Sequence, residues 1–252
     1  MVDSHTHLHI CKDDSAALVA DAAAAGITHM VTIGTEIASS EQALADAERF
    51  AHSGVYAAVG IHPNAATGFS DGDAERLLEL GRHERCVAIG ETGFDYFREH
   101  SSHTDQERAF RAQLEIAREL DKPLVIHTRE ADDDTLALLS AHADGVKVIL
   151  HCFSMGGRIE ECLEHEDWWI SFAGNITYPA NQALRDAALR VPASRLLVET
   201  DAPYLAPQGM RGKPNQPVNV ITTAEAVALE RRVPYYEFNN EVEAAAAALF
   251  GW

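Results

Sequence analysis

Two histidines separated by one residue, His5 and His7, stand near the start of the chain, in the segment VDSHTH of residues 2–7. If this segment is a β-strand, successive side chains alternate between its two faces, so both imidazoles point to the same side. Two neutral imidazoles on one face can bind one cation, because imidazole is the commonest metal ligand in proteins. A short His-x-His pair also occurs by chance, so its meaning depends on whether the rest of the chain brings further ligands to it.

The rest of the chain repeats one unit, which is a short apolar run, a polar turn and an amphipathic segment. Continuous apolar runs that alternate with helical segments predict a parallel sheet covered by helices. We expect the strands at residues 1–4, 29–34, 55–60, 86–90, 123–126, 146–150, 168–173 and 195–198. We expect helices at about 13–26, 35–51, 73–82, 104–120, 133–142, 218–230 and 236–250.

These units predict a (β/α)8 barrel, a TIM barrel that forms a single domain over residues 1–252. An open doubly wound sheet is the competing fold. That fold concentrates function at a glycine-rich first turn, and the sequence has no G-x-G-x-x-G turn.

Composition limits the compartment and the partners. The chain has 252 residues, 46% of them hydrophobic, and no apolar run near the roughly 20 residues that span a membrane. The start lacks the basic and apolar segments of a secretory signal, and the four scattered cysteines fit free thiols in a reducing cytoplasm. The chain has 20 basic and 39 acidic residues, and the resulting net charge of −19 repels nucleic acid and anionic membranes from the surface as a whole. Local cations must therefore attract any phosphate substrate.

Candidate ligands stand at equivalent places in several units. A barrel gathers the carboxyl ends of its strands at one face, so residues distant in sequence meet there. The expected ligands end the first, fourth, fifth, sixth and eighth strands and are His5, His7, Glu91, His127, His151 and Asp201. By contrast, the histidines that fall among the predicted helices are expected at the surface, namely His52, His83, His142 and His165.

Six ligands exceed what one tetrahedral ion needs, so they predict two divalent ions, which we expect to be Mg²⁺, Mn²⁺ or Zn²⁺. The predicted sets are His5, His7 and Asp201 for one ion and His127 and His151 for the other, with Glu91 as the catalytic bridge. Such a pair lowers the pKa of a shared water and stabilises the attacking and leaving oxygens of an ester. Asp201 is also the predicted general base, and Glu199 is expected behind the ligands, where it can orient one of them.

The same segments give the chain a resemblance to a known family. They read DSHTH at 3–7, GIHP at 60–63, GETGFD at 90–95, HTRE at 127–130, HCFS at 151–154, ETDAPYL at 199–205 and RGKPNQP at 211–217. Over nearly its full length the chain resembles the TatD family of metal-dependent deoxyribonucleases, within the amidohydrolase-like barrels. The resemblance implies a phosphodiesterase that acts on DNA by means of a pair of divalent metal ions. The chain departs from the usual pattern at His9, where an acidic or amide residue is common, and at Met155, where glycine is common.

Cations and aromatic rings at the same face are the candidate substrate contacts. His62 follows the third strand and could donate to a phosphate, while Arg129 shares the face of His127 and could bind a phosphate bidentately. Arg211 and Lys213 lie in the loop after the eighth strand, where barrels often bind phosphate. The rings that could stack on a base are Tyr96, Phe97 and Phe94, although core packing is at least as good an interpretation of Phe94. Cys152, beside His151, is expected to face away and pack in the core.

The leading interpretation is a cytoplasmic metal-dependent hydrolase of DNA, an exonuclease for single strands or frayed ends. One alternative is an amide or ester hydrolase for a small molecule or an aminoacyl-tRNA, since the same binuclear centre serves both chemistries. Another is a barrel that binds without catalysis. The intact ligand set, with Asp201 present, argues against that last interpretation.

Overall fold

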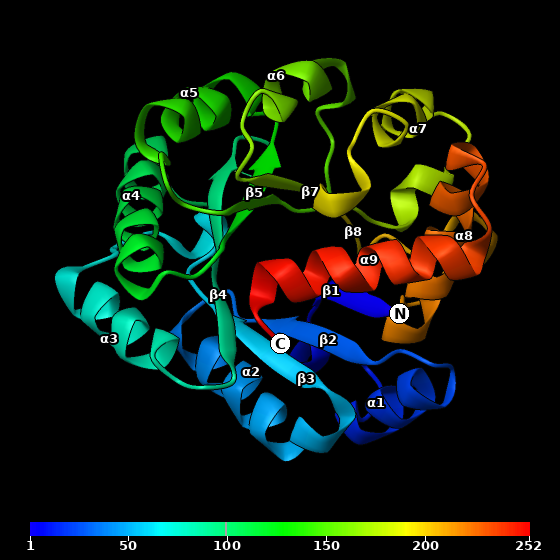
Figure 1. Cartoon of the computed structure of the whole chain (residues 1–252). Coiled ribbons are helices and arrows are strands. Elements are labelled where there is room, and N and C mark those ends of the chain that lie inside the picture. Colours follow the sequence, from blue (N-terminus) through cyan, green and yellow to red (C-terminus); the bar gives the residue numbers. More distant parts are fainter. Residues whose placement is uncertain (99) are drawn as a thin grey trace.

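Eight parallel strands lie side by side in one sheet that curves into a barrel (Figure 1). The computed structural model describes residues 1–98 and 100–252. The strands pair in chain order, and their bounds are β1 Val2–Thr6, β2 His29–Ile33, β3 Val55–Val59, β4 Cys86–Asp95, β5 Leu124–Arg129, β6 Val148–Leu150, β7 Trp168–Phe172 and β8 Leu196–Val198. The predicted (β/α)8 barrel is confirmed.

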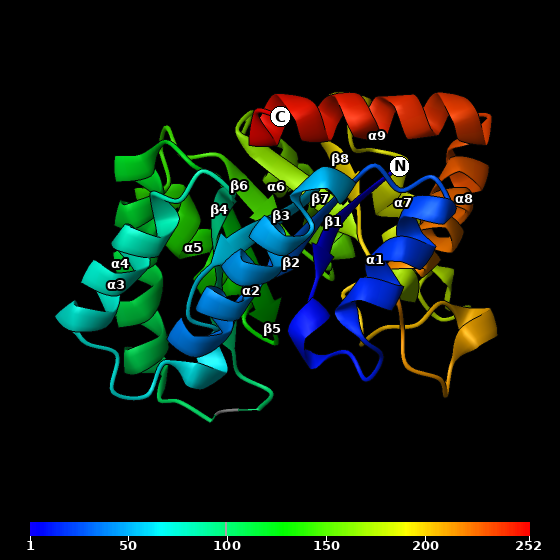
Figure 2. The same ribbon diagram turned by 90° about the horizontal axis from the view of Figure 1, so that it is seen from below.

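Helices form a layer around the barrel (Figure 1). They are α1 Ser15–Ala24, α2 Ile37–Arg49, α3 Asp71–Gly81, α4 His103–Leu120, α5 Asp132–His142, α6 Ile159–Leu163, α7 Gln182–Ala188, α8 Val220–Arg231 and α9 Tyr235–Phe250. The last of these, α9, lies across the end opposite to the carboxyl ends of the strands (Figure 2). The prediction missed α6 and α7, because helices this short show too little of the 3.6-residue period. In the part of the chain that the structure describes, no helix is long and apolar enough to cross a bilayer.

Apolar side chains fill the barrel and the space between strands and helices. Val59, Ile126 and Val198 are fully buried, as the continuous apolar runs of their strands predict. Burial of each such side chain contributes about 1.5–3 kcal/mol to the stability of the fold. The four histidines predicted at the surface are exposed or half-buried. This packed layer holds the strand ends in fixed positions relative to one another.

Strand β4 is longer than predicted. The sequence places its end at Gly90, but the strand continues to Asp95, so Glu91 lies within the strand rather than after it. Pairing with β5 shifts register between Ile89 and Thr92. Gly90 has a φ of +124°, and a Cβ there would lie 2.6 Å from the Val125 carbonyl oxygen, so only glycine fits. The prediction was wrong because this glycine marks an irregularity inside the strand, not its end.

The barrel closes between β8 and β1 through a short set of contacts that we call the seam, formed by residues 3–7 and 198–202. Two strand ends meet there through main-chain hydrogen bonds and one buried carboxylate. The contacts are Asp201 N to His5 O at 2.9 Å, His7 N to Ala202 O at 2.8 Å, and Thr200 N and Oγ1 to the carboxylate of Asp3 at 2.8 and 2.7 Å. The seam therefore fixes the loop after β8 against the His-x-His segment.

Candidate metal centre

Imidazole nitrogens and carboxylate oxygens converge at the carboxyl ends of five strands. The cluster contains all six predicted ligands, which are His5, His7, Glu91, His127, His151 and Asp201. Four of these side chains are at most 4% exposed, whereas Asp201 is 13% and His127 is 18% exposed. Removing so many ionisable groups from water is costly unless they are paired or bind a cation. The donor set and its burial fit divalent metal ions.

The first ligand set comprises His5 in β1, His7 directly after β1, and Asp201. His5 Nε2 and His7 Nε2 lie 3.2 Å apart and are 3.8 and 3.4 Å from Asp201 Oδ1. His7 Nδ1 is 3.0 Å from the Ile33 carbonyl, which can only accept a hydrogen bond. The proton of neutral His7 therefore sits on Nδ1, and the Nε2 lone pair faces the cluster.

The second set comprises His127, His151 and Glu91. Glu91 Oε1 lies 2.8 Å from His127 Nδ1 and 2.9 Å from His151 Nε2. Its other oxygen, Oε2, lies 3.5 Å from His5 Nε2. The carboxylate thus directs one oxygen toward each set, although it comes from inside β4 rather than from the end of the strand.

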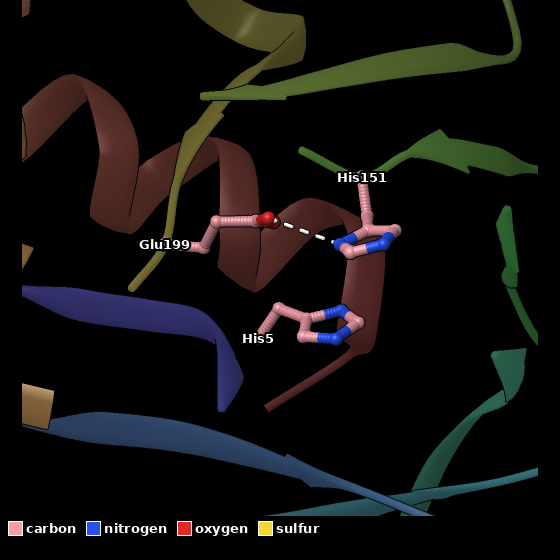
Figure 3. Close-up of side chains that lie close together, drawn as sticks. All are labelled: His5, His151 and Glu199. Carbon is pink, nitrogen blue, oxygen red and sulfur yellow. Dashed lines mark hydrogen bonds and ion pairs between the residues drawn. The ribbon is translucent and has the colours of Figure 1, made fainter. Parts of the chain in front are cut away.

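Glu199, directly after β8, lies behind the second set. Its Oε1 is 3.0 Å from His151 Nδ1 and accepts a hydrogen bond from the Cys152 backbone at 2.8 Å. Figure 3 shows Glu199 pointing at His151, whose ring stacks on that of His5 with centroids 3.9 Å apart. Within the described residues, His5 Nδ1 and Glu199 Oε2 are buried and have no hydrogen-bond partner.

Asp95, at the end of β4, received no role in the sequence prediction. Its Oδ2 lies 3.3 Å from His127 Nε2 and accepts a hydrogen bond from Asn64 at 2.8 Å. Its Oδ1 accepts hydrogen bonds from the backbone of Phe97 and Arg98. Strand parity could have found this residue, because positions 91 and 95 share a face once β4 is extended.

Electrostatic coupling ties the protons of the cluster together. Burial acts on Glu91 to raise its pKa, but the charge of His151 and hydrogen bonds from His127 and His151 hold that pKa well below the usual range. Burial likewise opposes the charged form of His151, yet Glu91 and Glu199 raise its pKa well above 6.5. The pKa of His7 and that of His127 are raised against burial by their carboxylate neighbours, whereas burial lowers the pKa of His5. The carboxylates thus stabilise positive charge on His7, His127 and His151, and divalent cations could take the place of these protons.

His62, at the end of the β3 unit, is a neutral neighbour of the cluster. Its Nδ1 accepts a hydrogen bond from the Asn64 backbone at 3.0 Å, so the proton sits on Nε2, which lies 3.6 Å from Glu91 Oε1. Burial, with the charge of His127, lowers the pKa of His62 to about 3. The side chain can therefore donate a hydrogen bond through Nε2 at neutral pH, but it adds no positive charge.

The predicted arginine and lysine contacts lie at the strand ends, with Arg129 as the last residue of β5 and with Arg211 and Lys213 in the loop after β8. Arg129 is half-buried, with its guanidinium 3.8 Å from the centre of the Phe97 ring. Arg211 is exposed and lies over Tyr178 at 4.7 Å, and Lys213 is exposed in the same loop. Among the described residues, neither Arg129 nor Arg211 forms an ion pair.

Two of the three aromatic residues proposed for base stacking are placed elsewhere. Phe94 is 3% exposed and packs edge-on against Phe110 in the core, so the core interpretation is correct. Tyr96 is half-buried, with its hydroxyl donating to Asp134 at 2.7 Å. Phe97 is 55% exposed and open to a ligand.

Three residues near His151 and His7 remain to be compared with the sequence predictions, namely Cys152, Met155 and His9. The prediction that Cys152 packs in the core is wrong, because β6 ends at Leu150 and the alternation of strand faces does not extend to residue 152. The residue is half-buried, and its Sγ accepts a hydrogen bond from Asn175 Nδ2 at 3.8 Å. Met155 is buried, and the half-buried ring of His9 lies 6.1 Å from that of His7. Neither departure from the family pattern displaces a ligand.

Comparison with known proteins assigns the family. The profile of the family described as TatD related DNase matches residues 2–251. The chain belongs to this family. It is 37% identical to a protein of Mycobacterium tuberculosis named uncharacterized metal-dependent hydrolase TatD, over 100% of this chain and 99% of that one.

Two further relatives extend this result. A protein of Enterobacter lignolyticus, named 3'-5' ssDNA/RNA exonuclease TatD, is 37% identical over 94% of this chain and 93% of its own. The crystal structure of YJJV, a TatD homolog from Escherichia coli K12, superposes with a TM-score of 0.91 at 29% identity, over 100% of this chain and 98% of that one. The chain is therefore a TatD-family metal-dependent hydrolase with the barrel of that family.

Proposed function

We propose that the chain is an exonuclease that hydrolyses phosphodiester bonds of DNA at the end of a single strand or at a frayed duplex end, using two divalent ions. The observation that carries the proposal is the position of Glu91, whose two oxygens face two separate imidazole sets. The name of the Enterobacter lignolyticus relative supports nucleic acid as the substrate.

The residues that would hold the ions are the six convergent ligands. His5, His7 and Asp201 would bind one ion, His127 and His151 the other, and Glu91 both. Bound there, divalent ions would polarise the phosphate and lower the pKa of the attacking water. Glu199 would hold His151 with its Nε2 lone pair directed inward, as carboxylates do for many ligand histidines.

Asp201 would act as the general base. It is the most exposed carboxylate among the ligands at 13%, so a water molecule can reach it. The water oxygen would attack the phosphorus, Asp201 would take the proton of that water, and the bond from phosphorus to the leaving nucleoside oxygen would break, with that oxygen taking a proton from solvent. Solvent also reaches His62 and His127, at 17% and 18% exposure, so the phosphate would enter beside these three residues.

Substrate binding would use the neutral and cationic donors around this entrance. His62 would donate its Nε2 proton to a phosphate oxygen. Arg129 would bind a phosphate bidentately, and Arg211 and Lys213 would hold the next phosphate of the strand. The alternative activity, hydrolysis of an amide or an aminoacyl ester, uses the same centre and is the outcome that a test must separate.

The test compares substrates on one preparation of the purified chain. Protein loaded with Mg²⁺, Mn²⁺ or Zn²⁺ is assayed against linear and closed circular single-stranded DNA, blunt duplex DNA, RNA, amides and aminoacyl esters. We expect chelator-sensitive release of mononucleotides from linear single strands. Asp201→Asn is the matched control for contaminating nucleases. Hydrolysis confined to amides or aminoacyl esters, or cleavage that survives both chelation and Asp201→Asn, would contradict the proposal.

A further inference from the structure

Tyr204 carries a large aromatic ring at the rim of the metal centre that has no role in the reaction described above. Its side chain is 51% exposed, and its ring centroid lies 6.3 Å from that of His7, with the planes at 73°. Within the described residues, its hydroxyl forms no hydrogen bond and its ring contacts no other aromatic group except His7. One face of the ring is therefore free to contact a bound molecule beside the candidate metal-binding histidines.

The backbone of Tyr204 is fixed relative to the general base. Its N–H donates to the carbonyl of Asp201 at 2.8 Å, and its own carbonyl accepts from Asn215 Nδ2 at 2.8 Å. Asn215 is 1% exposed and donates equally to the carbonyl of Thr200, which lies in the seam. A ring held this way can bind a flat ligand without first ordering its own loop, which lowers the entropic cost of binding.

The surroundings of the ring indicate an anionic ligand with a flat part. Arg98 is exposed and follows β4, where its backbone N–H donates to Asp95 Oδ1 at 3.0 Å, so it stands at the same barrel face. Phe97, beside it in sequence, offers a second exposed ring under Arg129. Aromatic faces alternating with guanidinium groups are the usual surface for single-stranded nucleic acid, because bases stack on the rings and phosphates contact the cations.

We propose that Tyr204 is the stacking surface for the base of the nucleotide whose phosphodiester is hydrolysed. This inference rests on the proposed nuclease function and deepens it. A base inside a duplex is covered on both faces by its neighbours, so only an unpaired terminal base can reach the ring. The contact selects for single strands or frayed ends and tolerates all four bases, since every base has an aromatic face.

The experiment uses two oligonucleotides that differ only at the terminal nucleotide, which carries a base in one and a tetrahydrofuran abasic site in the other. Loss of a stacked base contact corresponds to about a 5- to 150-fold change in affinity. We therefore expect Tyr204→Ala to raise KM for the base-bearing strand by about this factor and to change KM for the abasic strand far less. Tyr204→Phe, which keeps the ring, should restore KM. The control is Tyr236→Ala on α9, because Tyr236 is equally an exposed tyrosine, at 65%.

A binding measurement separates failure of this inference from failure of the nuclease proposal. A strand that ends in 2-aminopurine is titrated with Asp201→Asn protein, with and without Tyr204→Ala, and the fluorescence of the base is followed. Quenching that disappears with Tyr204→Ala supports stacking even if no strand is cleaved. Quenching that persists, or a Tyr204→Ala change of equal size on base-bearing and abasic strands, overturns the inference.

Discussion

Asp95 illustrates how one carboxylate outside the six candidate ligands can control the protonation of one of them, His127. In neutral His127 a proton on Nε2 faces Asp95 at 3.3 Å, which leaves the Nδ1 lone pair directed at the cluster. Carboxylates in this position fix the tautomer and the ring orientation of a ligand histidine and raise its basicity. Asp95 is itself held by two backbone donors, so its position does not depend on a bound ion.

Asp95→Asn tests this arrangement. Asparagine keeps the Oδ1 acceptor for the Phe97 and Arg98 amides but places an amide nitrogen, a donor, against His127 and Asn64. We expect metal affinity and activity to fall about 10- to 100-fold with little change in folding. Competition with a chromogenic chelator measures the affinity, and Asp144→Asn, at an exposed position, is the control. Unchanged affinity would remove Asp95 from the metal centre.

Asp201 carries the prediction that is closest to the chemistry. Asp201→Asn keeps one oxygen ligand but removes the negative charge and the proton acceptor, so we expect kcat to fall by about 10²–10⁴. Part of the metal should remain bound, because His5 and His7 are unchanged. Steady-state kinetics and elemental analysis of the same sample measure the two effects. A variant with nearly wild-type kcat would exclude the role of general base.

At the scale of the elements, carboxylates and histidines from separate strands stabilise one another's charges. The pKa of His7, His127 and His151 is raised above the ordinary 6.5, so these rings stay protonated to a higher pH than a free histidine. A nitrogen must lose its proton before it binds a metal, so affinity rises as pH rises toward and past these pKa values.

We therefore expect apparent metal affinity to increase as pH rises above 6.5, with protons released on binding. Calorimetric titration in buffers of different ionisation enthalpy measures both quantities. The number of released protons should fall as pH increases, since fewer rings then carry one. Affinity that does not depend on pH in this interval would contradict the raised pKa values. His62, with a pKa of about 3, is already neutral throughout and adds nothing to the effect.

The strands could be predicted from the sequence because apolar runs and turn residues are local signals. The positions of His151 and Asp201 follow from the strands, since barrel topology brings strand ends together whatever their exact bounds. The irregularity in β4 was not readable, because it depends on how closely Gly90 approaches β5, which is a tertiary contact. That one error hid Asp95. The exposure of Tyr204 and the burial of Phe94 are likewise set by packing, and the two aromatic residues look alike in a sequence.

The whole molecule is acidic, and this limits how it could hold the proposed DNA substrate. A net charge of −19 disfavours a long contact with duplex, which depends on many lysines and arginines. The rim offers few cations, so we expect a shallow salt dependence that reflects about two or three phosphate contacts rather than the six to ten of a strong duplex binder.

Cleavage rates of linear single strands across a salt series measure this slope. Arg211→Ala and Lys213→Ala should raise KM more than they lower kcat, if both residues bind substrate and transition state alike. Arg82→Ala, at an exposed residue directly after α3, is the control. A steep slope, or equal cleavage of closed circular and linear strands, would show that the substrate is held in another way.

The seam has a consequence for the time at which the site is completed during translation. His5 and His7 leave the ribosome early, whereas Asp201 and the loop that locks it against β1 are made near the end of translation, at about 5–20 residues per second. If the proposed function is correct, a nascent chain carries five of the six candidate ligands for some seconds without Asp201, the residue that would take the proton from water. Ribosome-bound chains stalled at increasing lengths should stay inactive until Asn215, which anchors the loop, has emerged. Activity in chains stalled before β8 would refute this. The closure of the barrel would thus withhold the proposed nuclease activity until the fold is complete.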